Sequence, residues 1–353
     1  MKKLLPLLSL AFLLSCSAEP ESLCVKYARF LTDPNGYVCV RADSPIVVDG
    51  DLSDPAWRNA GVSDAFCDIS GEGFPSPLYA TRVRMLWDDD FLYIGAELEE
   101  PDLQGSIAGR DEVIWKDNDF EVFLDPDGDG RNYYEIETNA LGTVFDLFLE
   151  GPYRCPDRPY IMFQWDCQGL RSAVRTCGTL NDGSDTDVLW SVEMAIPQKA
   201  IVPEFDSCLQ EGSYLRVGFS RVEWQWEDGA HRKDADGGEL PEFNWTWGPT
   251  GMIAMHMPER WGYVWLQDSS RTFEYPASRD AEKLLWAIFY AQEEAFSESG
   301  SYMKDVRLSK KDLELLPEGA AISTETHSYG YKTTMQLPDG NCIAISQEGR
   351  IYR

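Results

Sequence analysis

The side chains best suited to ligand chemistry in this chain gather in residues 111–146. Trp115 precedes the tetrapeptide Lys-Asp-Asn-Asp, and Glu121 follows two residues after that tetrapeptide. In a dry core these polar groups would each need a hydrogen-bond partner. A sugar suits them better, because an indole stacks on the C–H groups of the ring while carboxylates and amides bind its hydroxyls. The pattern predicts a carbohydrate site that includes Trp115 and Asn118.

Two strands are expected to position these residues. Apolar and acidic side chains alternate over residues 120–124 and again over residues 134–138, on either side of an acidic turn. Alternation with a period of two is typical of a half-buried strand. Two simpler interpretations stay open at this point. Trp115 is then a hydrophobic plug at the rim of the fold, and Glu121 is an outward carboxylate paired with a surface cation.

The turn between the two strands places carboxylates at alternate positions. Asp125, Asp127 and Asp129 are followed by Gly130, as in the first half of an EF-hand calcium loop. The bidentate glutamate expected at position twelve of such a loop is Ile136 here, which excludes a complete EF-hand. The alternatives are a calcium site of another kind and a hairpin turn rich in residues that tolerate left-handed backbone.

Four other segments lie in the order and spacing of one known family. They are residues 46–57 (IVVDGDLSDPAW), 81–95 (TRVRMLWDDDFLYIG), 188–197 (VLWSVEMAIP) and 256–264 (HMPERWGYV). Together with residues 111–146 they resemble the family 9 carbohydrate-binding modules, which are β-sandwich domains found on xylanases and in bacterial surface lipoproteins. The resemblance covers residues 41–267. It implies a mainly β protein with an antiparallel β-sandwich and calcium bound in loops.

By this resemblance Trp115 stacks on the sugar and Glu121 accepts hydrogen bonds from its hydroxyls. The family clamps the sugar between two tryptophans, and the second falls at Met255 in this sequence. A family arginine on the strand after the acidic turn is replaced by Glu135. Both changes should weaken or redirect binding. Trp245 and Trp247, in an adjacent loop, are the candidates for the missing second face.

The first sixteen residues predict export. Lys2 and Lys3 precede an apolar run over residues 4–14, and the sequence Leu-Leu-Ser directly precedes Cys16. A basic start, a short apolar stretch and a small residue before the cleavage site are typical of a secretory signal. The run is too short to span a membrane. Cys16 resembles the acylated cysteine of a bacterial lipobox, and Ser17 after it favours the outer membrane over retention at the inner one. An ordinary signal peptide with a chance cysteine is the alternative.

Charge and cysteine content limit which classes of partner, metal site and disulfide can be expected. The formal net charge is -29, from 60 acidic against 31 basic residues, which argues against nucleic acid and against electrostatic binding to anionic lipid. Eight of the nine cysteines lie beyond Cys16, and an even number in an exported chain predicts up to four disulfides. With three histidines and no CxxC pair, a zinc site is not expected.

The chain is expected to divide into four parts. Residues 1–16 are the signal peptide, 17–40 a tether, 41–268 the sandwich, and 277–353 a small α+β unit. In that last unit, apolar residues between Ala281 and Phe296 recur at helical spacing, with Ser278 as the cap and Ser299-Gly300 as the stop. Strands are expected over residues 329–336 and 342–346. The helix should pack against its own strands or the sandwich, the alternative being a partner protein of the cell envelope.

These observations favour a non-catalytic lipoprotein of the outer membrane that binds poly- or oligosaccharide and supports carbohydrate catabolism. The rival prediction is a structural or assembly protein of the envelope whose sandwich has lost sugar binding. A third is a glycoside hydrolase, since such an enzyme needs only two well-placed carboxylates. The sequence carries no GxSxG, P-loop or dinucleotide fingerprint.

Overall fold

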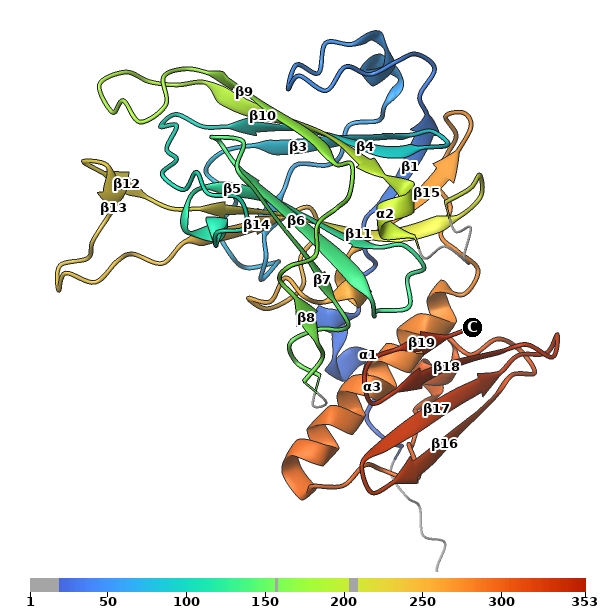
Figure 1. The fold of residues 1–353 in the computed structure, drawn as a ribbon. Helices are drawn as coiled ribbons and strands as arrows, with labels where there is room; N and C mark the ends of the chain where they lie inside the picture. Colours follow the sequence, from blue (N-terminus) through green and yellow to red (C-terminus); the bar gives the residue numbers. More distant parts are fainter. Residues whose placement is uncertain (1–18, 156–157, 203–208) are drawn as a thin grey trace, which may run out of the picture.

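The computed structural model describes residues 19–155, 158–202 and 209–353 and is dominated by β-structure (Figure 1). In the described residues one curled sheet of thirteen strands makes up the larger part. Its strands are β1 (Gly36–Arg41), β2 (Cys67–Asp68), β3 (Thr81–Trp87), β4 (Phe91–Glu99), β5 (Asp119–Asp125), β6 (Tyr133–Asn139), β7 (Val144–Leu149), β8 (Ile161–Met162), β9 (Arg171–Cys177), β10 (Leu189–Pro197), β11 (Tyr214–Glu223), β14 (Phe243–Thr246) and β15 (Gly262–Gln267).

The sheet folds over on itself to make two layers. Neighbouring strands run in the order β8-β7-β6-β5-β11-β15-β1-β3-β4-β10-β9, with β14 pairing β11 and β2. In Figure 1, β3, β4, β9 and β10 lie above β5, β6 and β14. Large apolar side chains such as Ile94, Val122 and Trp190 fill the space between the layers. This arrangement confirms the predicted sandwich. The exception to its antiparallel pairing is β1, which runs parallel to both β15 and β3.

The alternation in the sequence places the core residues as predicted. On β5 the side chains of Phe120, Val122 and Leu124 are fully buried in the core between the layers. Inward side chains of β10 and β11 follow the same period. The opposite face of β5 and β6, which the prediction left to solvent, is also buried. That second buried face holds the candidate site.

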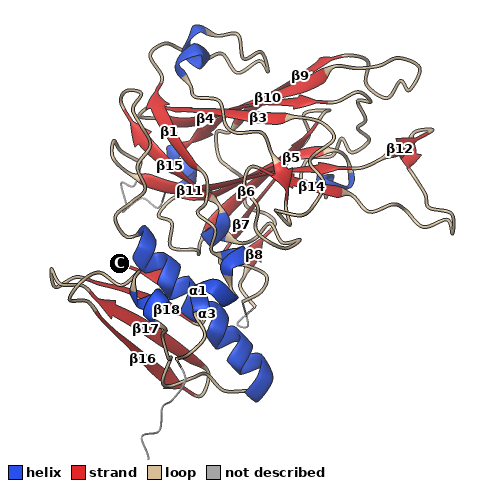
Figure 2. Cartoon of the chain, turned by 180° about the vertical axis from the view of Figure 1, so that it is seen from behind, coloured by secondary structure: helices blue, strands red, loops and turns tan. Residues whose placement is uncertain are grey.

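The C-terminal residues form a separate small sheet with a helix packed on it (Figure 2). Helix α3 (Arg279–Ser299) lies against β16 (Ala321–His327), β17 (Gly330–Gln336), β18 (Cys342–Ser346) and β19 (Ile351–Tyr352), and the short α4 (Lys310–Leu313) precedes them. This unit matches the predicted α+β class, and α3 covers its own strands as expected. The helix stops at Gly300, whose φ of 69° is a left-handed cap. Ser278 stands at the N-cap but donates to Glu282 Oε1 instead of accepting a backbone N–H.

Two arginines near the C-terminus tie this unit to the sandwich. Arg350 Nε lies 2.7 Å from Asp129 Oδ2, and Arg353 donates to the carbonyls of Asp127 and Gly128. The remaining short elements are α1 (Leu23–Lys26), α2 (Gln198–Ile201), β12 (Trp226–Glu227) and β13 (Ala230–His231), with the 3-10 turns η1 (Ala28–Phe30), η2 (Pro55–Asn59), η3 (Ile114–Lys116) and η4 (Pro258–Arg260).

The N-terminal extension is more ordered than a tether. Residues 36–40 belong to β1 of the large sheet, and Leu31 packs into the core of the C-terminal unit. Buried side chains at Tyr37 and Cys39 explain why this segment joins the fold. Cys16 and the predicted signal peptide lie outside the described residues. Of the helices in residues 19–155, 158–202 and 209–353, none has the length and apolar character needed to cross a membrane.

The predicted disulfide framework is not formed in the described part of the chain. Free thiols are found at Cys24, Cys39, Cys67, Cys167, Cys177 and Cys342. Several of these side chains serve instead as small apolar groups. Cys39, for example, is fully buried in the sandwich core, and this burial raises the pKa of its thiol well above the ordinary value.

Candidate functional site

A cavity of about 350 Å³ opens on the buried outer face of β5, β6 and β7. Glu121, Glu135 and Glu137 form its floor. The walls include Phe145, Leu147, Met255 and His256, and the mouth carries exposed aromatic and aliphatic side chains. A concave site with apolar walls and a few converging polar groups is the usual form of a small-ligand pocket. Among the described residues, two other cavities are also lined by predicted site residues, and both are smaller in volume.

Strand register brings the floor together. Glu121 on β5 is directly opposite Glu137 on β6, and Glu135 lies two residues from Glu137 on the same face. Asp119, two residues before Glu121, points to that face as well. Oxygen atoms of Asp119, Glu121 and Glu137 all lie within 4.8 Å of one another. These three carboxyl groups and Glu135 are called the acidic floor below.

Burial makes the acidic floor electrostatically unusual. All four side chains are at most 5% exposed. Burial raises the pKa of Glu121 to about 7. Burial first, and neighbouring carboxylates second, raise the pKa values of Asp119, Glu135 and Glu137 well above their ordinary range. Among the described residues, His256 alone reaches the floor as a base, with Nε2 3.9 Å from Glu135, and burial together with Arg154 lowers the pKa of His256 to about 3. The histidine is therefore neutral.

Large apolar side chains surround the mouth of the cavity and face solvent. Trp115 is 39% exposed, Tyr153 54%, Phe163 49% and Ile253 73%. Single exposed apolar residues are common, but a group around one cavity marks an interaction site. These four residues are called the aromatic rim below. The rim offers flat apolar faces directly above the hydrogen-bond acceptors of the floor.

Trp115 is held in place by its backbone and a second tryptophan. It lies in η3, its carbonyl oxygen accepts from Trp224 Nε1 at 2.9 Å, and its ring stacks on that of Trp224 with centroids 6.4 Å apart. The plug interpretation would have buried this ring, whereas more than a third of the residue faces solvent at the cavity mouth.

The structure brings Trp115, Glu121 and Met255 together on the one cavity. Met255, at the position of the second family tryptophan, is a partly buried wall residue. Glu135, which replaces the family arginine, lies in the floor. Glu121 differs from the expected outward, hydrated carboxylate: it is 3% exposed, because the wall and rim residues of the cavity cover this face of the sheet.

Asn118 does not line this cavity. It is buried, its Nδ2 donates to Glu100 Oε2 at 3.1 Å, and its Oδ1 accepts from the Trp224 amide and from Trp226 Nε1. The amide is thus used to join η3 to the chain after β11. Its predicted contact with a sugar hydroxyl stays a prediction.

Trp245 and Trp247 are not a second stacking face for this cavity either. They are 2% and 3% exposed and belong to the core between the two layers. Alternation along β14 explains this, since Phe243, Trp245 and Trp247 point to the same inward face while Asn244 and Thr246 point away. Tyr153 and Phe163 are the additional aromatic rings at the cavity.

The acidic turn at Asp125, Asp127 and Asp129 has its carboxylates largely engaged. Asp125 accepts from the amides of Gly128 and Gly130, and Asp129 accepts from the amide of Arg131 and from Arg350 Nε. A calcium ion would have to compete with these donors, so the residues present fit a hydrogen-bonded turn better than a calcium loop. Calcium at this turn stays a prediction.

Sequence reasoning missed several cavity residues. Glu137 shares the parity of Glu121 and Glu135 along predicted strands, so period-two alternation could have found it. Tyr153 and Phe163 come from the irregular chain around β8, and Ile253 from a loop before η4. No periodic signal marks such loop residues.

Comparison with known proteins agrees with this architecture. A family model described as carbohydrate family 9 binding domain-like matches residues 48–146. Over these residues the chain is similar to that family. The family 9-like segment runs to Asp146 on β7 and thus includes Trp115 and the whole acidic floor, whereas Tyr153, Phe163 and Met255 lie beyond it. No curated protein matches the sequence.

Several solved structures are also similar to this chain. One is a provisionally named carbohydrate-binding protein from Bacteroides uniformis, with 15% identity, a TM-score of 0.48, and coverage of 67% of this chain and 99% of the other. Two are structures of a family 9 carbohydrate-binding module from Caldicellulosiruptor kristjanssonii, with cellotriose (17% identity, TM-score 0.43, 68% and 98% coverage) and with glucose (17%, 0.42, 68% and 100%).

Proposed function

We propose that the cavity between the aromatic rim and the acidic floor binds one sugar unit of a poly- or oligosaccharide. The observation that carries this proposal is the exposed Trp115 ring at the mouth of a cavity whose floor consists of hydrogen-bond acceptors. An indole covers the apolar face of a sugar, and carboxyl oxygens accept from its hydroxyls. The family 9-like segment supports the same class of ligand.

The binding role is non-catalytic in this proposal. The rim has aromatic faces at Trp115, Tyr153 and Phe163, which suit retention of a sugar. The protein would keep carbohydrate near the cell for degradation or import by other proteins.

Calorimetric titration with xylo- and cello-oligosaccharides tests this function. We expect saturable binding with one site per chain and no release of shorter sugars on long incubation. Absence of binding to every sugar of a glycan array would contradict the proposal and favour the structural role in the envelope. Release of shorter sugars would favour the glycoside hydrolase.

We propose further that Cys16 is acylated and tethers the protein to the outer membrane. The lipobox-like Leu-Leu-Ser-Cys sequence supports this, and stable anchoring takes at least two acyl chains. The full-length protein should partition into detergent, and a form that begins at Ser17 should stay in the aqueous phase. A Cys16→Ala protein that still carries lipid would contradict the anchor.

A further inference from the structure

The acidic floor lacks the partners that buried charges need. Glu121 and Glu137 are directly opposite on paired strands, where like charges destabilise a sheet. In the described part of the chain, none of the four floor residues forms an ion pair with a lysine or arginine. Asp119 Oδ2, Glu121 Oε2 and Glu137 Oε2 are buried and accept no hydrogen bond. Leaving buried polar oxygens without partners costs free energy, so this arrangement calls for a ligand.

A neighbouring hydroxyl group adds an independent observation. Ser220 on β11 is directly opposite Glu121, on the side away from Glu137, and is 1% exposed. Its Oγ is buried and faces Glu121, whose pKa it lowers, but the contact does not have the geometry of a hydrogen bond. A fourth oxygen donor therefore points to the same face as the three carboxyl groups, and it too is unsatisfied.

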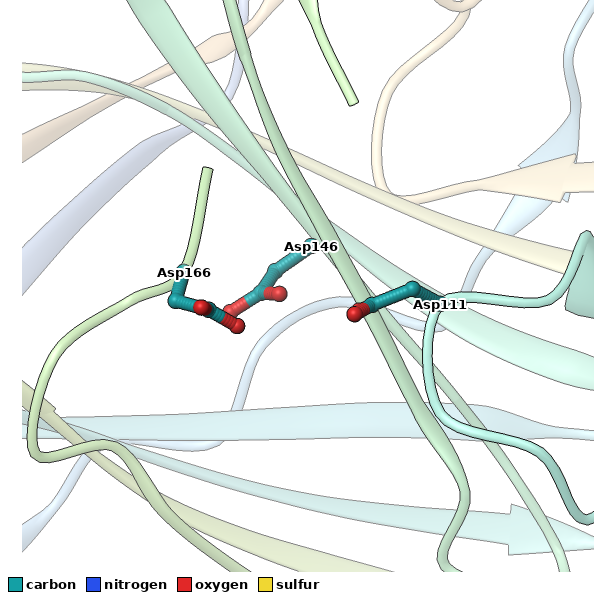
Figure 3. A group of neighbouring side chains, drawn as sticks. All are labelled: Asp111, Asp146 and Asp166. Carbon is teal, nitrogen blue, oxygen red and sulfur yellow. The ribbon is translucent and has the colours of Figure 1, made fainter. Parts of the chain in front are cut away.

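Two other groups of close carboxylates in the described residues show how this chain normally satisfies such oxygens. Asp111, Asp146 and Asp166 converge in space (Figure 3), and Arg110 lies between 2.7 and 3.6 Å from all three. The acidic turn uses its own amides and Arg350. Both groups carry their counter-charge or donors within the chain. The acidic floor does not.

We propose that a divalent cation, with calcium as the best match, binds between Asp119, Glu121 and Glu137, and that hydroxyls of the bound sugar complete its coordination. Calcium prefers oxygen ligands at 2.3–2.6 Å, so two ligand oxygens are at most about 5 Å apart. The ligand oxygens of Asp119, Glu121 and Glu137 all lie within 4.8 Å of one another, which is inside that limit. Glu121 and Glu137 line the cavity whereas Asp119 lies behind them, so the open side of the ion faces the sugar.

The ion site is independent of the proposed sugar binding. Only the role of the ion as a bridge to the sugar rests on that proposed function. It also gives a reason for the exchange of the family arginine for Glu135, because an arginine at that position would repel a cation. Sugar recognition would then depend on the metal in place of a basic side chain.

Metal binding is measured first, without sugar. Chelator-treated protein is titrated with CaCl₂ by calorimetry, and terbium luminescence excited through tryptophan gives a second signal, since Trp115 lies at the cavity. We expect one calcium site per chain, with affinity at least tenfold lower in Glu137→Gln. Asp111→Asn is the matched control: it alters another three-carboxylate group, at a φ of 62° that asparagine tolerates, and should bind calcium unchanged.

Three results would overturn the metal site. They are no calcium binding by the wild-type protein, equal affinity in Glu137→Gln, and a loss that appears in Asp127→Asn but not in Glu137→Gln. Folding is checked by melting in chelator, where Glu137→Gln should be at least as stable as wild type because one repelling charge is gone. The wild-type melting temperature should rise with CaCl₂. If Glu137→Gln does not fold, absence of that rise overturns the proposal.

Sugar titrations with and without EDTA then separate the two proposals. A tenfold or larger loss of sugar affinity in EDTA supports the bridge. Equal sugar affinity in EDTA overturns the bridge and leaves the proposed function standing. Calcium binding without any sugar binding supports the ion site and contradicts the proposed function.

Discussion

Two buried clusters of carboxyl groups lie on the same sheet, and they differ in whether the protein supplies a positively charged partner. At one, Glu100 and Glu223 flank Arg221, with N–O distances of 2.9 and 2.8 Å and all three side chains at most 4% exposed. At the other, the acidic floor has no arginine or lysine partner among the described residues. Arg221 also donates a hydrogen bond to the Thr81 hydroxyl, and Asn118 Nδ2 donates one to Glu100. The first cluster is closed within the chain; the second lacks a partner and borders a cavity.

This difference indicates that the Arg221 cluster stabilises the fold, whereas the acidic floor is available to a ligand. Residues on the two faces of β11 show it at adjacent positions, since Arg221 points into the sandwich and Ser220 to the acidic floor. Burial raises the pKa of Glu223 to about 8, with Arg221 acting in the opposite direction and Glu100 in the same one. Arg221 thus offsets part of the effect of burial, and the Arg221 cluster needs no further ligand.

The largest expected effect is loss of Arg221. Arg221→Met should destabilise the protein by about 3–5 kcal/mol, because Glu100 and Glu223 would stay buried without a cation. Urea unfolding measures this. Arg175→Met, which removes an exposed arginine paired with Asp51, is the control and should cost about 1 kcal/mol or less. Adding Glu223→Gln to Arg221→Met should recover part of the loss. If Arg221→Met lost no more stability than Arg175→Met, the Arg221 cluster would not be the stabilising one, and the contrast with the acidic floor would fail.

How far the sequence predicts the two clusters differs in the same way. Alternation predicted the strands that carry the acidic floor, and the resemblance predicted Trp115 and Glu121. Closure of the Arg221 cluster was not predictable, because Arg221 lies 121 residues along the chain from Glu100, the carboxylate to which Asn118 also donates. The pairing of Glu121 with Glu137 required strand register, which a turn of unknown geometry does not fix.

Tryptophan roles were predictable only where periodicity applied. Phe243, Trp245 and Trp247 follow the period of a strand, and this indicates the buried role that the structure shows. Trp115 lies in a 3-10 turn, where no period tells the exposed face from the buried one. Only the resemblance pointed to its place at the cavity.

The second prediction contrasts these two tryptophans. Trp115→Ala should cost about 1–3 kcal/mol of sugar affinity, as expected for a central aromatic contact, and about 1 kcal/mol of stability. Trp245→Ala should cost about 3–5 kcal/mol of stability, because it leaves a cavity in the core. Calorimetry and melting on both variants give the two quantities. A large stability loss with unchanged affinity in Trp115→Ala would return it to the role of a rim plug.

The smallest expected effect concerns a third way to satisfy a buried carboxylate, with neutral donors alone. Asp312 is fully buried and accepts hydrogen bonds from the Leu23 and Cys24 amides, the Ser22 hydroxyl, and the amide and hydroxyl of Ser309. Burial by itself would raise the pKa of Asp312, but the bonds from Cys24, Ser22 and Ser309 outweigh it and lower the pKa to about 2. The pKa of Asp312 is therefore shifted in the direction opposite to that of the floor carboxyls.

Asp312→Asn should cost about 1–2 kcal/mol at pH 7, the scale of a lost capping interaction at α4. Because the pKa of Asp312 is lower in the folded than in the unfolded protein, its stabilisation is complete above about pH 4 and is lost as the pH falls through about 2. The difference between wild type and variant in urea unfolding should shrink over that range. Asp339→Asn, at an exposed turn, should show little difference at any pH. A constant difference for Asp312→Asn would mean that amide geometry, and not charge, explains the loss, and that neutral donors do not keep this carboxylate ionised.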